Sequence, residues 1–156
     1  DSQGPRLPKL LRFPLGLVPT RLNSTVLAQI LNRLFKPELA EGELDFLDRR
    51  VMLIHVEDAG LSYRLTLRHR QLAAAPDGTE DDLSIAGNVY EFLLLASRRE
   101  DPDTLFFNRR LRLGGNTELG LFVKNFLDGL ELDDRLGPIK KVLDGATGLM
   151  DRLTRR

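Results

Sequence analysis

Residues 81–131 read DDLSIAGNVYEFLLLASRREDPDTLFFNRRLRLGGNTELGLFVKNFLDGLE, and this segment gives the strongest indication of the fold. Leu83 and Ile85 alternate with small or polar neighbours, as the residues of a half-buried strand do. Asn88 is a candidate N-cap for a helix over residues 89–97, with Glu91 at the capping-box position. A strand followed directly by a helix is therefore predicted at the start of the segment.

The second half of this segment repeats the order of a strand and then a helix. A proline-containing turn at residues 101–104 precedes residues 105–113, whose second half alternates between apolar and basic side chains, so a strand is predicted there. Gly114 and Gly115 end that strand, and Asn116 would cap the next helix. The apolar positions of that helix recur at spacings of three and four and share one face: Leu119, Phe122, Phe126 and Leu130.

The preceding part of the chain predicts two helices and three further strands. The first helix begins at residues 22–25, and the second covers residues 38–46. The strands cover residues 51–57, 61–68 and 71–75. Within residues 61–68 the alternation places Leu65 and Leu67 in the core and Thr66 and Arg68 in water. Three alanines at residues 73–75 would either leave room for a cavity or let a helix pack closely. With helices gathered on one face of five strands, the fold class is α+β.

The two ends of the chain differ from this body. Residues 1–21 are basic and apolar, and their prolines exclude a membrane-spanning helix, so they would form an ordered arm over the domain or an interfacial anchor. Residues 138–155 predict an amphipathic helix that needs a surface, which the domain itself, the mouth of a tunnel, a second copy or a membrane would supply. Acidic residues interrupt its polar face, which favours a tunnel lid or a dimer contact over a membrane. The predicted division is an N-terminal arm over residues 1–21, a domain over residues 22–131 and a C-terminal segment over residues 132–156.

The composition excludes several classes of function. The 156 residues include 23 basic and 23 acidic side chains, so no overall field favours nucleic acid. The lack of cysteine excludes disulfides, thiolate metal sites and a cysteine nucleophile, and it fits a cytoplasmic protein. No nucleophile elbow, phosphate-binding glycine loop or metal cluster occurs at a workable spacing. We therefore predict a protein that is not an enzyme and that needs no metal or cofactor.

The ordered series in residues 81–131 resembles the sterol-carrier-protein-2-like domains, and the resemblance extends over roughly residues 22–131. It is clearest in residues 82–85 before a helix, in residues 101–107, and in LRLGGNTEL over residues 111–119. Arg109 stands where many members of that family have glycine, and Asn116 where aspartate is common. The resemblance implies a five-stranded, mostly antiparallel sheet with helices packed on one face, enclosing an apolar tunnel for lipid.

Residues 106–111 and 115–125 are most similar to those members of the family that act as accessory factors in oxygen-independent ubiquinone biosynthesis. The resemblance implies a non-catalytic protein that holds or presents hydrophobic ubiquinone precursors. A protein-interaction scaffold and a general phospholipid carrier are the alternatives. The implied partners are a quinone precursor or phospholipid and enzymes of the pathway such as anaerobic hydroxylases, with a homodimer left open. The implied location is cytoplasmic, with peripheral contact at the inner face of the membrane.

The predicted tunnel would be walled by apolar side chains of the two helices and of the strand between them. They are Val89, Phe92, Leu93, Phe107, Leu119, Phe122, Val123 and Phe126. Five basic side chains and one aromatic ring are predicted to bind the headgroup or dock at the membrane: Arg6, Lys9, Arg12, Phe13, Arg110 and Arg112. Arginines that alternate along a strand are also typical of a solvated sheet face, and that interpretation stays open for Arg110 and Arg112.

Overall fold

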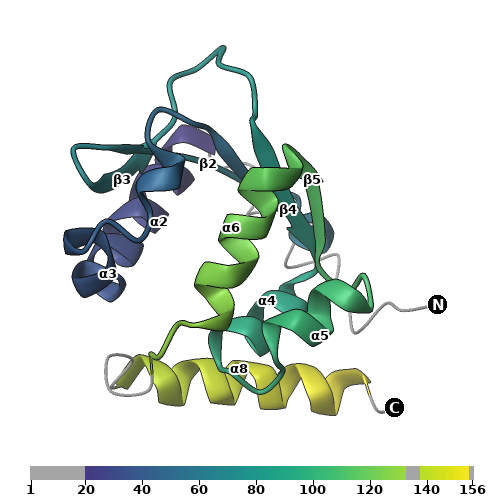
Figure 1. The fold of residues 1–156 in the computed structure, drawn as a ribbon. Helices are drawn as coiled ribbons and strands as arrows, with labels where there is room; N and C mark the ends of the chain where they lie inside the picture. The colour runs from purple at the N-terminus through teal and green to yellow at the C-terminus, as the bar shows by residue number, and fades with distance from the viewer. Residues whose placement is uncertain (1–19, 133–137, 155–156) are drawn as a thin grey trace.

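A computed structural model describes residues 20–132 and 138–154 of the chain. Five strands form one sheet in the order β3-β2-β1-β4-β5 (Figure 1). Their bounds are β1 Met52–Val56, β2 Leu61–Arg68, β3 Gln71–Ala74, β4 Leu83–Gly87 and β5 Arg112–Gly115. The pair β1 and β4 is parallel and the other three pairs are antiparallel, which confirms the predicted α+β fold with a mostly antiparallel sheet.

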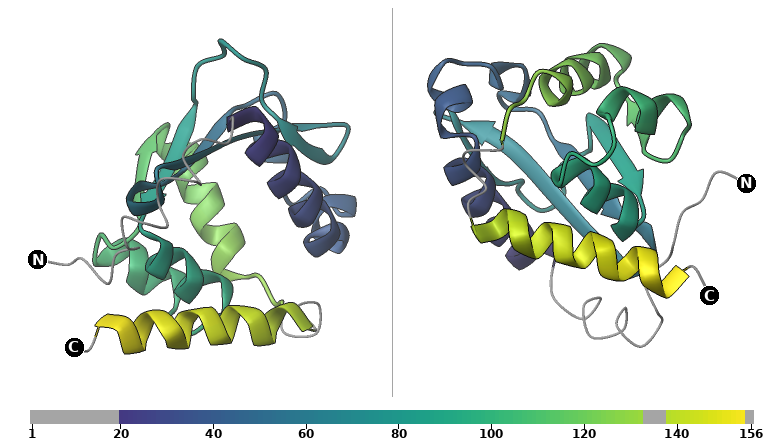
Figure 2. Two further views of the ribbon diagram at one scale, coloured as in Figure 1. Left: turned by 180° about the vertical axis from the view of Figure 1, so that it is seen from behind. Right: turned by 90° about the horizontal axis from the view of Figure 1, so that it is seen from below.

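The helices surround this sheet in two groups. They are α2 Thr20–Leu34, α3 Lys36–Ala40, α4 Val89–Ala96, α5 Pro102–Phe107, α6 Thr117–Asp128 and α8 Pro138–Thr154, with single 3-10 turns at η1 Asp45–Leu47 and η2 Glu57–Ala59. Figure 2 shows α8 lying across the end of the molecule beside α4, while α2 lies beside β2 and β3 at some distance from α8. Helix α6 runs between the two groups (Figure 1).

The main core lies where the inward residues of the sheet meet these helices. Leu65 and Leu67 of β2 are 0% and 1% exposed, as their alternation predicts. Leu83 and Ile85 of β4 join the same cluster together with Leu119 of α6. Burying each such side chain contributes roughly 1.5–3 kcal/mol to folding, so this cluster sets the position of α6 against the sheet.

The edge of the sheet at β3 is closed by α2. The Asn32 side chain donates a hydrogen bond from Nδ2 to the Leu72 carbonyl at 2.9 Å and accepts one at Oδ1 from the Leu72 N–H at 2.8 Å. The Ser24 hydroxyl oxygen accepts a third bond from the Arg64 N–H at 2.8 Å. Because an open edge would pair with other chains, these side chains protect the sheet from edge-to-edge association.

The strand predicted over residues 105–113 is wrong in its first half. Residues 102–107 form α5, with Pro102 in its first turn, and β5 begins at Arg112. Leu105 and Leu111 are both buried, at 0% and 1% exposure, and the turn between them places Arg109 at a φ of 59°. Proline is well suited to the first turn of a helix, so the helix start and not a β-turn explains the sequence at 101–104.

Two other local predictions need correction. The Asn88 side chain makes no cap bond, and Asp58 Oδ1 accepts the hydrogen bond from the Val89 N–H at 2.9 Å. The short helix predicted over residues 38–46 divides into α3 and η1. Asn116, in contrast, caps α6 as predicted, with its Oδ1 accepting from the Leu119 N–H at 3.0 Å. The C-terminal helix is present, whereas the predicted arm over residues 1–21 lies almost entirely outside the described residues.

Candidate functional site

Two aromatic pairs join α6 to the opposite side of the fold. The Phe122 ring stacks on the Phe46 ring, with centroids 5.5 Å apart and planes at 24°. One turn further along α6, Phe126 meets Phe35 edge to face, at 5.3 Å and 80°. Such pairs contribute about 0.5–1.5 kcal/mol beyond burial, so the rings help to hold α6 against the α2–η1 side.

The structure distributes the predicted tunnel residues over three environments. Leu119 and Val123 belong to the buried core, and Phe92 and Phe126 are partly buried against it. Val89 and Leu93 are partly buried outside that cluster, and Phe122 is 44% exposed. Phe107 is 87% exposed at the end of α5. The α6 residues are therefore brought together, whereas Phe107 is not brought to them.

Two cavities among the described residues are lined largely by polar and charged side chains. One of about 180 Å³ lies beside the C-terminal half of α6 and is lined by Glu38, Glu43, Asn125, Phe126 and three residues that follow α6. The larger one lies near the end of β2 and is lined mainly by charged side chains. Neither is an apolar tunnel, so the tunnel stays a prediction.

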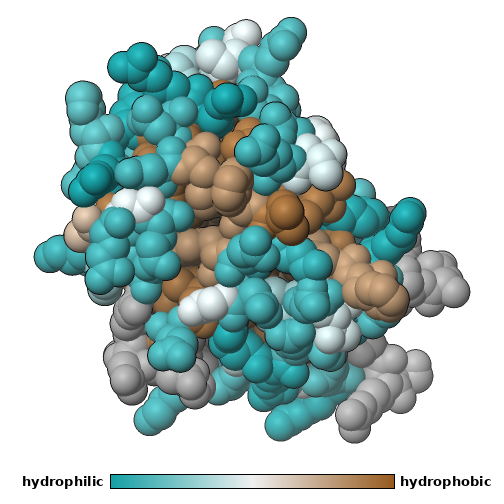
Figure 3. Space-filling model, viewed as in Figure 1, coloured by the Kyte–Doolittle hydropathy of each residue, from teal (hydrophilic) through white to brown (hydrophobic). Residues whose placement is uncertain are grey.

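Apolar surface is exposed beside the aromatic pairs. Leu121 and Phe122 of α6 are 56% and 44% exposed, and Leu113 of β5 is 36% exposed. Figure 3 shows hydrophobic surface running across the middle of this face, between hydrophilic regions above and below. Because exposed apolar patches mark interaction or ligand sites, this face is the candidate hydrophobic site.

A buried ion pair lies between α4 and the turn before β5. Glu91 is 2% exposed and accepts a hydrogen bond at Oε2 from Arg110 Nη2 at 2.8 Å. The Arg110 guanidinium also lies 5.5 Å from the centroid of the Tyr90 ring, and the Tyr90 hydroxyl donates to Asp151 of α8. The ion pair therefore joins α4 to the turn before β5, and the hydrogen bond between Tyr90 and Asp151 joins α4 to α8. The sequence predicted Glu91 as a capping-box residue, and its pairing with Arg110 was not predicted.

Burial raises the pKa of the Glu91 carboxyl above its ordinary value, although the Arg110 guanidinium opposes the shift. Burial also raises the pKa of the Tyr90 hydroxyl, and its hydrogen bond to Asp151 adds to the shift. The Arg110 Nε is a buried donor with no hydrogen-bond partner among the described residues. This centre therefore carries an uncompensated electrostatic cost at neutral pH.

That cost predicts how stability depends on pH. The folded-state pKa of Glu91 exceeds the unfolded value of about 4.3, so its stabilising contribution is complete below that pH and is lost as the pH rises through the folded pKa. Glu91→Gln is neutral throughout and should not show this loss. Urea denaturation at a series of pH values should therefore show the variant gaining stability relative to the parent as the pH rises. A constant difference, or one that falls with pH, would contradict the assignment.

The predicted docking residues are only partly covered by the structure. Arg110 is committed to Glu91, and Arg112 pairs with Glu57 at the surface. Arg6, Lys9, Arg12 and Phe13 lie outside the described residues. Arg109, next to Arg110, is exposed and makes no ion pair among residues 20–132 and 138–154. A headgroup role for Arg110 would therefore require it to leave Glu91.

Two further features bear on the kind of site. The described part of the chain holds no group of three or more histidine, cysteine or acidic side chains that would bind a metal ion. None of its helices has the length and apolarity needed to cross a membrane. What the site offers chemically is apolar contact area with basic groups nearby.

Comparison with known proteins agrees with this arrangement. The sequence pattern of the SCP-2 sterol transfer family matches residues 27–128, and the chain belongs to that family. It is 39% identical over 136 residues to the ubiquinone biosynthesis accessory factor UbiT of Escherichia coli strain K12, and the alignment covers 87% of this chain and 78% of that protein. The UbiT of Escherichia coli O157:H7 matches to the same extent.

A solved structure shares the fold. The UbiJ-SCP2 ubiquinone synthesis protein superposes with a TM-score of 0.55 at 17% sequence identity, covering 71% of this chain and 93% of that one. At this identity the similarity concerns the fold alone. It shows that the sheet with its surrounding helices is an SCP2-like domain.

Proposed function

We propose that this protein is a non-catalytic accessory factor that holds or presents hydrophobic ubiquinone precursors during oxygen-independent ubiquinone biosynthesis. The observation that carries the proposal is the α6 face, where Phe122 remains 44% exposed although it stacks on Phe46. Membership of the SCP-2 sterol transfer family and the similarity to UbiT support the pathway.

The proposed ligand site opens where the two aromatic pairs separate. Phe46 and Phe35 stand on one side, and Phe122 and Phe126 stand on α6. When the rings part, a polyprenyl chain would contact them together with the other predicted lining residues of α4 and α6. Each ring pair contributes only about 0.5–1.5 kcal/mol beyond burial, so the chain replaces contacts that are inexpensive to break.

Delivery to a membrane is part of this proposal. A methylene moved from water into an apolar pocket gains about 0.8 kcal/mol, but a lipid in a bilayer has already realised that gain. Affinity must therefore come from docking at the bilayer and from contacts to the polar end of the lipid. The basic arm, through Arg6, Lys9, Arg12 and Phe13, is the proposed docking element, and Arg110 and Arg112 are the proposed contacts to the polar end of the lipid.

Deleting residues 1–21 should weaken co-sedimentation with anionic vesicles. The deletion removes several cations, so the residual binding should also lose much of its dependence on salt. The measurement is the bound fraction at two salt concentrations for the full and shortened chains. Unchanged binding with an unchanged salt response would show that the arm has a structural role instead.

The proposed function itself is tested by identifying the cargo. The full chain would be purified from cells grown without oxygen, examined by native mass spectrometry, and extracted for lipids. Polyprenylated quinone precursors at a fixed ratio to protein are the expected result. An extract with the lipid composition of the bulk membrane would indicate a general phospholipid carrier, and an empty protein would remove the carrier function.

A scaffold role is the second candidate, because α8 exposes an apolar stripe. Val142, Leu149 and Leu153 are 69%, 56% and 52% exposed and fall on one face of the helix. Enzymes of the pathway, such as anaerobic hydroxylases, or a second copy of this chain would cover that stripe. If Leu149→Asp abolished quinone synthesis in cells while the purified variant kept its cargo, the scaffold role would be favoured.

A further inference from the structure

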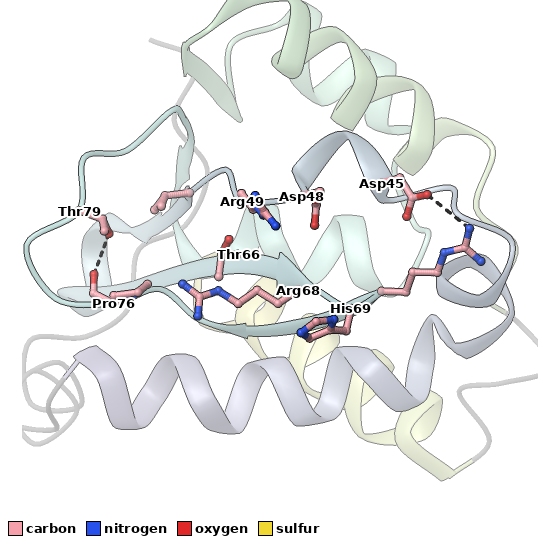
Figure 4. A pocket seen from close by; sticks show the side chains of 10 residues that line it. Asp45, Asp48, Arg49, Thr66, Arg68, His69, Pro76 and Thr79 are labelled. Atoms are coloured by element: carbon pink, nitrogen blue, oxygen red, sulfur yellow. Dashed lines mark hydrogen bonds and ion pairs between the residues drawn. The ribbon is translucent and has the colours of Figure 1, made fainter.

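A groove of about 740 Å³ lies on the other side of the sheet from the main core. It is bounded by the segment between η1 and β1, the end of β2, the β2–β3 turn and the loop after β3 (Figure 4). Thr66 and Arg68 line it and alternate with the core residues Leu65 and Leu67, so they point away from the core. The groove is therefore distinct from the α6 face.

Thr66 lies at the floor of this groove. The alternation in residues 61–68 predicts that Thr66 faces water, but Thr66 is only 3% exposed, because the groove walls cover it. In Figure 4 the side chains of Arg49 and Arg68 lie on either side of Thr66. The two guanidinium groups come from separate segments of the chain and share one cavity.

The cations of the groove are only partly neutralised. Arg70 lies 3.8 Å from Asp45 and also donates to the Ala40 carbonyl. Arg49 and Arg68 form no ion pair or side-chain hydrogen bond with any residue that the structure describes, while the one other acid of the groove, Asp48, is exposed. The guanidinium groups of Arg49 and Arg68 are therefore free to bind an anion, and His69 lines the same groove.

The backbone of the walls is held in an uncommon conformation. Arg49, His69 and Arg70 have φ values of 58°, 53° and 59°, and they are three of the five described non-glycine residues with positive φ. His69 and Arg70 are the two central residues of the hairpin turn between Arg68 of β2 and Gln71 of β3, and a two-residue turn of this kind requires positive φ at both positions. The turn therefore sets the backbone direction at His69 and Arg70, and Arg49 has the same conformation between η1 and β1.

We propose that this groove binds a phosphate-bearing anion, with Arg49 and Arg68 donating to its oxygens and the Thr66 hydroxyl donating a third bond. The guanidinium fork matches the spacing of phosphate oxygens, and a phosphate dianion compensates two free arginines. A volume of about 740 Å³ lies in the range of small-molecule sites. The phosphate belongs either to a soluble metabolite or to a lipid headgroup, because both present the same oxygens.

The test compares two arginine variants with a neighbouring control. Arg49→Asn removes one guanidinium and keeps a side chain that tolerates positive φ. Arg68→Gln removes the other, and both residues are exposed, so the variants should fold. Arg50→Gln is the matched control, because Arg50 is exposed and adjacent but does not line the groove. Circular dichroism and thermal melting of each full-length variant establish that folding is unchanged.

The probes are inorganic phosphate, glycerol phosphate, and vesicles of phosphatidylglycerol or phosphatidylcholine. Titration of the labelled full chain should shift amide resonances around residues 66–70, and each arginine variant should bind about ten- to a hundredfold more weakly. Arg50→Gln should bind within twofold of the parent. Arginine-dependent binding of the soluble phosphates identifies a metabolite, and arginine-dependent binding of phosphatidylglycerol vesicles alone identifies a headgroup. Binding that neither variant weakens, or no binding of any probe, would overturn the proposal and leave the α6 face unaffected.

Discussion

Gly115→Ala is expected to destabilise the fold by about 2–5 kcal/mol. This loss is the sum of the conformational cost of alanine in a left-handed backbone and the cost of a steric clash. Gly115 has a φ of +82° and pairs with Leu83 of β4. A Cβ at this position would lie 2.6 Å from the Asp82 carbonyl oxygen and 2.9 Å from Leu83 Cα. Both neighbours are backbone atoms, so β5 would have to move away from β4.

Gly78→Ala is the matched control for that substitution. Gly78 has the same φ of +82°, but a Cβ there would meet no atom within 4 Å. It should therefore show only the conformational cost of about 1–2 kcal/mol. Urea denaturation of both variants separates the two contributions by subtraction. Equal losses of stability would mean that β4 and β5 relax freely, against the close approach that the structure shows.

The sequence predicted those elements whose pattern is local. The alternation in residues 61–68 identified β2, and the cap at Asn116 with its three-and-four spacing identified α6. In both cases the spacing of apolar residues within the element itself defines its buried face. The sheet order required more, because the parallel pairing of β1 with β4 joins segments about thirty residues apart.

The failure over residues 105–113 has a specific physical cause. Alternation of Leu111 and Leu113 marked the true strand β5, but extending it backward took in Phe106 and Phe107, which belong to α5. Asp101 followed by Pro102 is a helix-start signal as well as a turn signal. Burial of Leu105 decided between the two, and burial depends on tertiary packing.

The charged centres were not predictable for a related reason. Glu91 and Arg110 lie nineteen positions apart and meet only because α4 packs beside the turn before β5. Arg68 looked like a solvated strand residue, and Arg49 belonged to no recognised motif. Their common groove arises from folding of the η1–β1 segment against the end of β2, where the Arg49 N–H donates to the Leu67 carbonyl. Long-range packing of this kind leaves no periodic signal in a sequence.

Phe122→Ala and Phe126→Ala are expected to abolish retention of the hydrophobic cargo while leaving the protein folded. Phe122 is 44% exposed and Phe126 is partly buried, so each ring has fewer protein neighbours than a core residue. Their removal should therefore cost less than the roughly 3–5 kcal/mol typical of a phenylalanine in a core. The ligand, in contrast, would lose the ring faces that the proposed site offers when the aromatic pairs separate.

Three properties are measured for each variant: the melting curve, the lipid extracted from the purified protein, and the quinone content of cells grown without oxygen. Val26→Ala is the control, because Val26 is 49% exposed on α2 and lies in neither aromatic pair. The control should keep its cargo and support quinone synthesis, whereas the two phenylalanine variants should purify empty and fail to support it. If either variant melts far below the parent while its folded fraction keeps full cargo, the rings are ordinary core residues and the ligand lies elsewhere.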